Sequence, residues 1–379
     1  MCFITSRSTR AAFFCAAVLV PLRVGAASFH LPDAAPSPTL AALADYRHSY
    51  SGVVLDLGCS ADGRSNIDSL WHLTDYGRPA RTFDRGSAYA RIDVAQWWRL
   101  RAGEWWVGFG SGWIDSYGGN ADAAQLWIDL HAAGPSTDSY FPQAHMRKMS
   151  VQWYGIGRSF PMDSGDVRGR FELAVRRLVS NSYSELAAAG GVFGETFSGA
   201  VTRMQADTPH GRSLGRGWCV DAAAEFENRS WRARLQAEGL AGRMSWQDLA
   251  VDAGYLSSPG VFVDSEGFLR DVAGGFAGIS SRRSLSGPID PLVRFHLAQT
   301  CRPGLFITVA FRRGETPTTG LGAAWRDRRG REVFVCSYPA ARVGELGVGF
   351  SRFRCRILSD TWLLHDPRVA SVGLSVIMP

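Results

Sequence analysis

The residues from Leu214 to Leu249 form two successive runs in which apolar and polar side chains alternate. Because the side chains of a β-strand point to opposite faces with a period of two, each run predicts a strand with one apolar and one charged face. The polar break at Asn228-Arg229 predicts a short turn, so the two strands form a hairpin. The apolar positions are Trp218, Val220, Ala222, Ala224 and Phe226, then Trp231, Ala233, Leu235 and Ala237.

The same alternation recurs along most of the chain. It predicts an all-β protein of about 14 antiparallel strands, within a range of 12 to 16. Outside the hairpin at residues 214–249, the alternating segments lie around residues 53–57, 88–98, 105–113, 149–157, 170–176, 192–204, 293–298, 305–311, 321–325, 333–338, 346–350, 353–357 and 372–378.

Three places interrupt the pattern. The segment Tyr117–Met146 predicts an extended loop with a short helix at Ala121–Leu130, and residues 249–286 are less regular, with short strands at 261–263 and 274–279. The phase of the alternation changes between Phe350 and Phe353, which predicts a β-bulge within one strand.

Four tryptophans flank the predicted turn at Arg101–Gly103. They are Trp97, Trp98, Trp105 and Trp106. Such a group is typical of the aromatic girdle at a membrane–water boundary. A Trp-rich core hairpin or a surface that stacks on sugars are the alternatives.

The N-terminal residues 1–27 have the features of a cleaved secretory signal peptide. Arg7 and Arg10 precede the short apolar stretch Ala11–Leu22, and small residues follow, so we expect the mature protein to begin near Ala27 or Ser28. The alternative is a buried N-terminal helix. Residues 28–48 are then a leader or plug segment, in which Ser37 and Pro38 open a short helical stretch. Residues 49–379 form the barrel.

The alternation suits a membrane barrel and a soluble sandwich, and three features favour the barrel. The strands are about ten residues long, which is near the length that crosses a bilayer at a steep tilt. Tight hairpins alternate with longer loops. Charges of both signs stand in mid-strand on the polar faces, and in lipid such charges must face a wet interior. The sequence therefore predicts an antiparallel transmembrane β-barrel in the bacterial outer membrane.

This register divides the side chains between the interior and the lipid. We expect Phe171, Leu173, Val175, Val220, Leu235, Phe295 and Val309 to face lipid. The residues expected to line the lumen are Arg170, Glu172, Arg176, Glu225, Arg232, Arg234, Arg294, Arg312, Arg352, Arg354 and Arg356. Pairing of these charges across the lumen would leave no open pore or a small one, and the excess of arginine predicts a mild preference for anions. The alternative is that the charges only solvate and rigidify the interior.

The sequence contains no recognisable catalytic set, so we expect no enzyme activity, no cofactor and no metal site. The pairing of His296 with Ser280 or Ser281 is conceivable, but no spacing selects it. Five cysteines lie beyond residue 27 without a CxxC pair, which leaves zinc and redox sites unsupported. Removing residues 1–27 lowers the formal charge from +6 to about +3, so charge gives no reason to expect a nucleic-acid partner.

One stretch resembles a known group. Gly215-x-Gly217-Trp218 leads into Asp221, and the next strand ends in Gly242-Arg243-Met244-Ser245-Trp246. This resembles a group of uncharacterised bacterial outer-membrane barrel proteins, in which a G-x-G-x-x-x-D strand precedes a strand ending in G-x-I-x-W. More loosely it is similar to the fatty-acid-transporter-like barrels. The resemblance covers Arg168–Leu249 and implies a location and a fold, without a reaction.

The leading hypothesis is an outer-membrane channel, transporter or structural wall protein. Its expected partners are outer-membrane lipids and the barrel assembly machinery, and a small-molecule substrate is unknown. A secreted or periplasmic β-sandwich that binds glycans through the tryptophans is the first alternative. An outer-membrane hydrolase is the second.

Overall fold

The computed structural model describes residues 53–67, 86–132, 139–193, 196–206, 215–228, 230–258, 261–263, 269–271, 275–302, 305–313, 318–327, 331–350, 353–361 and 368–378. The predicted signal peptide and leader, residues 1–48, lie outside this part. The strands are β1 (Val53–Ser65), β2 (Ser87–Ala102), β3 (Trp105–Asn120), β4 (Ser139–Tyr140), β5 (Gln143–Ser164), β6 (Val167–Phe193), β7 (Thr196–Gln205), β8 (Gly215–Glu227), β9 (Trp231–Ser258), β10 (Val261–Val263), β11 (Leu269–Asp271), β12 (Gly275–Pro288), β13 (Leu292–Arg302), β14 (Leu305–Arg313), β15 (Thr318–Arg326), β16 (Glu332–Tyr338), β17 (Val343–Phe350), β18 (Phe353–Ser359) and β19 (Val369–Met378). The helices are α4 (Ala121–Ala132) and the 3-10 turn η2 (Pro339–Ala341).

The long strands form one closed antiparallel sheet. Each pairs with its neighbours in the ring, and β1 closes it by pairing with both β2 and β19. The strands β7 and β8 share one position between β6 and β9, and β12 and β13 share the position after β9. The described strands thus occupy 14 positions around the barrel, which confirms the predicted fold and rules out the β-sandwich.

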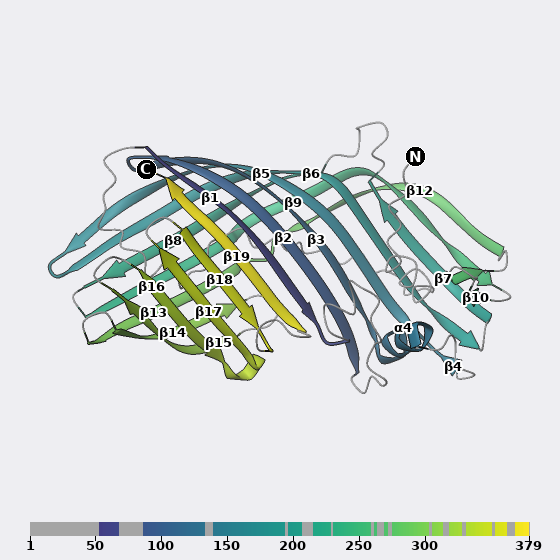
Figure 1. Ribbon diagram of the computed structural model, residues 1–379. Helices are drawn as coiled ribbons and strands as arrows, with labels where there is room; N and C mark the ends of the chain where they lie inside the picture. Colours follow the sequence, from purple (N-terminus) through teal and green to yellow (C-terminus); the bar gives the residue numbers. More distant parts are fainter. Residues whose placement is uncertain are drawn as a thin grey trace.

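The barrel wall is uneven in height (Figure 1). The strands β5, β6 and β9 contain 22, 27 and 28 residues, but β16, β17 and β18 contain only 7, 8 and 7. The C-terminus lies at the end that carries the tight turns β2–β3 and β5–β6, and α4 lies toward the other end. In outer-membrane barrels the short turns are periplasmic, so the end with α4 is the extracellular one.

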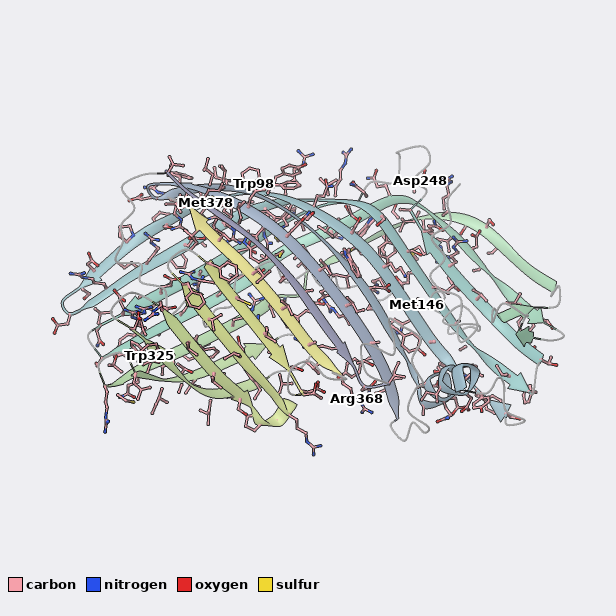
Figure 2. All side chains as sticks on the ribbon, in the orientation of Figure 1. Trp98, Met146, Asp248, Trp325, Arg368 and Met378 are labelled. Atoms are coloured by element: carbon pink, nitrogen blue, oxygen red, sulfur yellow. The ribbon has the colours of Figure 1, made fainter. Side chains whose placement is uncertain are left out.

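The two faces of the wall follow the alternation in the sequence. On β6, Leu173 and Val175 are exposed on the outer face, and the intervening Ala174 and Arg176 are buried on the inner face. Leu235 of β9 is also exposed. The other residues expected to face lipid, Phe171, Val220, Phe295 and Val309, are half-buried. The many large apolar side chains on the outside are visible in Figure 2.

Only half of the predicted tryptophan girdle lies on the outer face. Trp98 and Trp105 are exposed, but Trp97 and Trp106 are buried inside the barrel. The reason is the period of the strand, because two adjacent residues point to opposite faces. Trp106 fits because Gly108 beside it on β3 and Gly155 and Gly157 on the neighbouring strand β5 leave space for its ring, where a Cβ would crowd it.

Three local predictions differ from the structure. The phase change after Phe350 is a hairpin between β17 and β18, whose paired ends are Phe350 and Phe353. The predicted loop at residues 117–146 is much shorter, because β3 and β5 remain paired as far as Gly119 and Ala144. Residues 249–286 are also more regular than predicted, since β9 and β12 pair over most of this stretch.

The predicted short helix exists as α4. Asn120 caps it, because its Oδ1 accepts a hydrogen bond from the backbone N–H of Ala123 at 3.0 Å. Its apolar side chains pack against the outer face of the wall formed by the long strands β2, β3, β5 and β6. The buried cluster there contains Ile67, Ala88, Ala124, Leu126, Ile128, Tyr140, Leu186, Ala188 and Val192. Among the described residues, no helix has the length and hydropathy needed to cross a bilayer.

Candidate functional site

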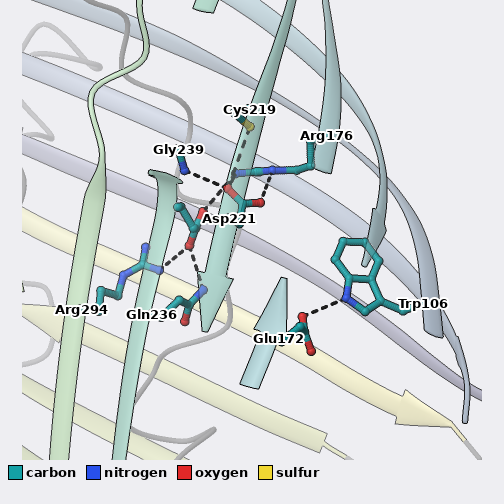
Figure 3. A network of polar contacts seen from close by, with 9 residues as sticks. Trp106, Glu172, Arg176, Cys219, Asp221, Gln236, Gly239 and Arg294 are labelled. Carbon is teal, nitrogen blue, oxygen red and sulfur yellow. Dashed lines mark hydrogen bonds and ion pairs between the residues drawn. The ribbon is translucent and has the colours of Figure 1, made fainter. Parts of the chain in front are cut away.

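The inner face of the barrel carries a chain of charged side chains around Arg176 (Figure 3). Arg176 Nη2 donates to Asp221 Oδ1 at 2.7 Å, and Arg176 Nε lies 2.6 Å from Asp221 Oδ2. The network of charges continues to Glu238, whose Oε2 lies 3.9 Å from Arg176 Nη2. Glu238 Oε1 accepts from Arg294 Nη1 at 2.6 Å and from Gln236 Nε2 at 3.0 Å. These residues come from β6, β8, β9 and β13, which follow one another around the wall.

A distorted stretch of backbone holds Asp221 in place. The pairing of β8 with β9 shifts between Val220 and Ala222, so that Val220 lies opposite Ala241 and Ala222 opposite Ala237. The extra residues of β9 include Gly239, whose φ of +63° favours glycine and whose N–H donates to Asp221 Oδ1 at 2.8 Å. The bulge therefore supplies a backbone donor to a carboxylate that already binds Arg176.

A second carboxylate lies nearer the turn between β2 and β3. Glu172 Oε2 accepts from Arg101 Nη2 at 2.7 Å and from Ser159 Oγ at 3.1 Å, and Glu172 Oε1 accepts from Trp106 Nε1 at 2.9 Å. Arg101 is on β2 and Glu172 on β6, with β3 and β5 between them. This contact therefore spans several strands.

Indole rings connect the two charged groups. The Arg99 guanidinium lies 5.0 Å from the centre of the Trp106 ring and 5.9 Å from that of Trp153, and the Arg176 guanidinium lies 5.4 Å from the Trp153 centre. Cations are attracted to the faces of such rings. We call the connected set the lumenal belt. It consists of Arg99, Arg101, Trp106, Trp153, Glu172, Arg176, Asp221, Glu238 and Arg294.

The other residues expected in the lumen also lie in the barrel wall. Three pair with acids on adjacent strands: Arg232 with Glu227 at 3.2 Å, Arg234 with Glu225 at 3.0 Å, and Arg356 with Glu345 at 2.9 Å. Arg170 and Arg354 are half-buried, and the side chains of Arg312 and Arg352 lie outside the described residues. These three pairs run along the wall between neighbouring strands. That the whole set lines a path for solutes stays a prediction.

Six of the nine members of the belt were not among the residues predicted to line the lumen: Arg99, Arg101, Trp106, Trp153, Asp221 and Glu238. Asp221 and Glu238 stand on the charged faces of their strands, and Arg99 is two residues from Trp97, so the period of two already put them on the inner face. Trp153 directly precedes the exposed Tyr154, so the same period puts Trp153 on the inner face. The sequence does not indicate which of the inward-facing residues contact one another, because those contacts depend on the register between strands.

The hydrolase hypothesis fails on geometry for the pair considered. His296 of β13 lies opposite Arg234 of β9, and Ser280 of β12 lies opposite Asp252 of the same strand. Arg234 and Asp252 are 18 residues apart on the same strand, so His296 and Ser280 are too far apart to share a site at a rise of about 3.3 Å per residue. Ser280 instead donates to Asp252 Oδ1 at 2.6 Å. Across the described chain, no three His, Cys, Asp or Glu side chains form a group that could hold a metal ion.

A closed antiparallel barrel with an apolar outside and charged side chains inside is a transmembrane β-barrel of the outer-membrane type, and lipid surrounds its outer face. No family model matches the sequence, and no curated protein matches it.

Solved outer-membrane barrels are similar in fold. A deltaS2S3 mutant of the monoaromatic hydrocarbon channel TodX shares 9% identity over 89% of this chain and 93% of its own, with a TM-score of 0.42. The toluene transporter TodX of P. putida shares 9% identity over 93% and 94%, with a TM-score of 0.39. The outer membrane protease OmpT from Escherichia coli shares 9% over 87% and 98%, with a TM-score of 0.21. Values this low carry no argument about activity, and the fold assignment rests on the strand pairing above.

Proposed function

We propose that this protein is an outer-membrane channel or transporter of low conductance and has no enzymatic activity. The observation that carries the proposal is the burial of the lumenal belt. Arg176 and Arg294 point into the barrel, yet only 2% and 3% of their surfaces are exposed. A wide water-filled pore would leave such guanidinium groups hydrated. At the height of the belt the barrel therefore offers a constriction.

The charges of the belt set the character of this constriction. Each guanidinium there is paired with a carboxylate or an indole ring, so a solute that passes must fit between ordered charges. Rings of charged side chains are a common basis of selectivity in pores. Because arginine is in excess among the inner residues named above, we expect a mild preference for anions.

The pore itself is tested by conductance in planar bilayers. We expect the wild-type barrel to give a small conductance or none. The double variant Arg176→Ala/Asp221→Ala removes both side chains of one pair, so neither charge is left buried without its partner. The constriction should then be wider, and the conductance should rise. A matched control is Arg158→Ala/Glu104→Ala, since this exposed pair lies at the periplasmic turn with its atoms 2.9 Å apart. A large, non-selective conductance in the wild type would overturn the proposal.

The same assay tests the N-terminal segment. The sequence predicts that residues 28–48 are a leader or plug, and we expect the assembly machinery to insert the protein after the signal peptide is removed. A barrel that lacks residues 28–48 should conduct like the intact barrel if the segment is a leader. Opening only after this deletion would indicate a plug.

A further inference from the structure

On the outer face of the wall formed by β2, β3, β5, β6, β8 and β9, the side chains change from apolar to aromatic to polar over three successive rows of paired residues. A row runs across the strands, and moving two residues along each strand reaches the next row. The row nearest the periplasmic turns is apolar and contains Leu100, Val107, Ile156, Val175, Val220 and Ala241. The middle row contains Trp98, Phe109, Tyr154, Arg177, Trp218 and Arg243. The third contains Gln96, Ser111, Gln152, Val179, Arg216 and Ser245.

The middle row marks the edge of the hydrocarbon layer on this wall. Trp98 and Phe109 have ring centres 6.2 Å apart, and those of Phe109 and Tyr154 are 5.1 Å apart, so the aromatic side chains form a continuous band. Aromatic residues gather where lipid headgroups meet the hydrocarbon. The polar row lies on the side away from the periplasmic turns, so this boundary faces the outer leaflet.

Three arginines stand at this boundary on β6, β8 and β9. Arg177 and Arg243 lie on either side of Trp218, directly opposite it on the two neighbouring strands. Arg216 precedes Trp218 by two residues and therefore shares its face. All three arginines are exposed, and Trp218 is 50% exposed. We call these four residues the arginine patch.

The arginine patch has positive charge without a matching acid. Within the described residues, the one polar contact of the three guanidinium groups is that of Arg243 Nε, which donates to Ser286 Oγ at 2.8 Å. Two other exposed arginines differ, since Arg158 pairs with Glu104 at 2.9 Å and Arg282 with Asp248 at 2.9 Å. A charge on the lipid-facing side of a barrel is costly in the hydrocarbon and tolerated near the interface. A negatively charged partner at this interface would therefore stabilise the three uncompensated charges.

We propose that the arginine patch binds the phosphate groups of an anionic lipid in the outer leaflet. Guanidinium groups donate two parallel hydrogen bonds to phosphate. Paired residues on neighbouring strands are about 5 Å apart, so the arginines surround Trp218 closely enough to share one phosphorylated headgroup. The Trp218 ring packs beside that headgroup, with its apolar part toward the acyl chains and its N–H toward the polar region.

The binding is measured by native mass spectrometry of the full barrel, which is titrated in detergent with lipid A carrying two phosphates. A basic residue near an anionic membrane surface strengthens binding about fivefold, so the triple variant Arg177→Gln/Arg216→Gln/Arg243→Gln should bind about 100-fold more weakly. Each single variant should bind about fivefold more weakly. Lipid A without its phosphates should bind the wild-type barrel as weakly as it binds the triple variant.

A matched control removes the same charge elsewhere on the outer face. The third arginine of this control is Arg203 of β7, which is exposed and donates to Gln205. The variant Arg158→Gln/Arg203→Gln/Arg282→Gln should bind the lipid like the wild type, and the triple lysine variant of the arginine patch should retain most of the affinity. Heat-modifiable migration in gels verifies that every variant is a folded barrel. The proposal is overturned if the glutamine variant of the patch binds like the wild type, if the control variant weakens equally, or if the phosphate-free lipid binds equally well.

Discussion

Replacement of Asp221 by asparagine tests whether the lumenal belt holds the barrel wall together. Asp221 accepts hydrogen bonds from Arg176 and from the backbone N–H of Gly239. The variant Asp221→Asn keeps the size of the side chain and removes its charge. Arg176 would then retain only Glu238 as an acidic partner in the described structure, at 3.9 Å.

The expected cost follows from the burial of Arg176. Removing one partner of a buried ion pair costs about 3–5 kcal/mol, because the other charge stays buried without compensation. The double variant Arg176→Met/Asp221→Leu leaves no unpaired charge at this pair, so it should cost less than Asp221→Asn alone. The comparison separates the penalty of a lone buried charge from the contribution of the pair itself.

The assay is reversible unfolding in urea of the barrel in lipid vesicles, followed by tryptophan fluorescence and by gel migration. The control is Asp115→Asn, which breaks an outward pair with Lys148 at 2.7 Å whose side chains are 33% and 42% exposed. Exposed pairs contribute about 0–1 kcal/mol. If Asp221→Asn cost no more than Asp115→Asn, the belt would have no structural role and the reasoning would be refuted.

Two further predictions concern the inner and outer faces. The variant Gly110→Val should destabilise the barrel by at least about 1–3 kcal/mol, because a Cβ at Gly110 would lie 2.4 Å from the Trp153 ring; Trp153→Ala in the same background should recover part of the loss, and urea unfolding that shows no recovery would contradict the clash. Spin labels at Leu235 and Gln236 should differ in relaxation by oxygen, since Leu235 is exposed on the outer face and Gln236 is buried inside. Equal relaxation at both sites would show that the assigned faces are wrong.

The strands and their two faces could be predicted from the sequence. A period of two depends only on the geometry of one strand, so the hairpin of β8 and β9 and the inward direction of Arg176 followed from local residues. The same rule separates Trp97 from Trp98, although a cluster of four tryptophans first indicated a girdle. The helix at residues 121–130 was also predicted locally, from a stretch whose cap residue is Asn120.

The partners of the inner charges required the tertiary structure. Arg101 and Glu172 are 71 residues apart in sequence, and they meet across β3 and β5 only because the sheet brings β2 and β6 this close together. Asp221 reaches the N–H of Gly239 only because three residues bulge from β9 at that height. A bulge changes the register and leaves the apolar pattern almost intact, so its position is weakly marked in the sequence.

The arginine patch illustrates the same division. Alternation puts Arg177, Arg216 and Arg243 on outer faces, and this much follows from the sequence. Their proximity around Trp218 depends on the pairing of β6 with β8 and of β8 with β9. A single strand fixes which face a side chain takes, because that is a property of the local backbone. Only the closed sheet decides which side chains become neighbours, because register is set by hydrogen bonds between segments distant in sequence.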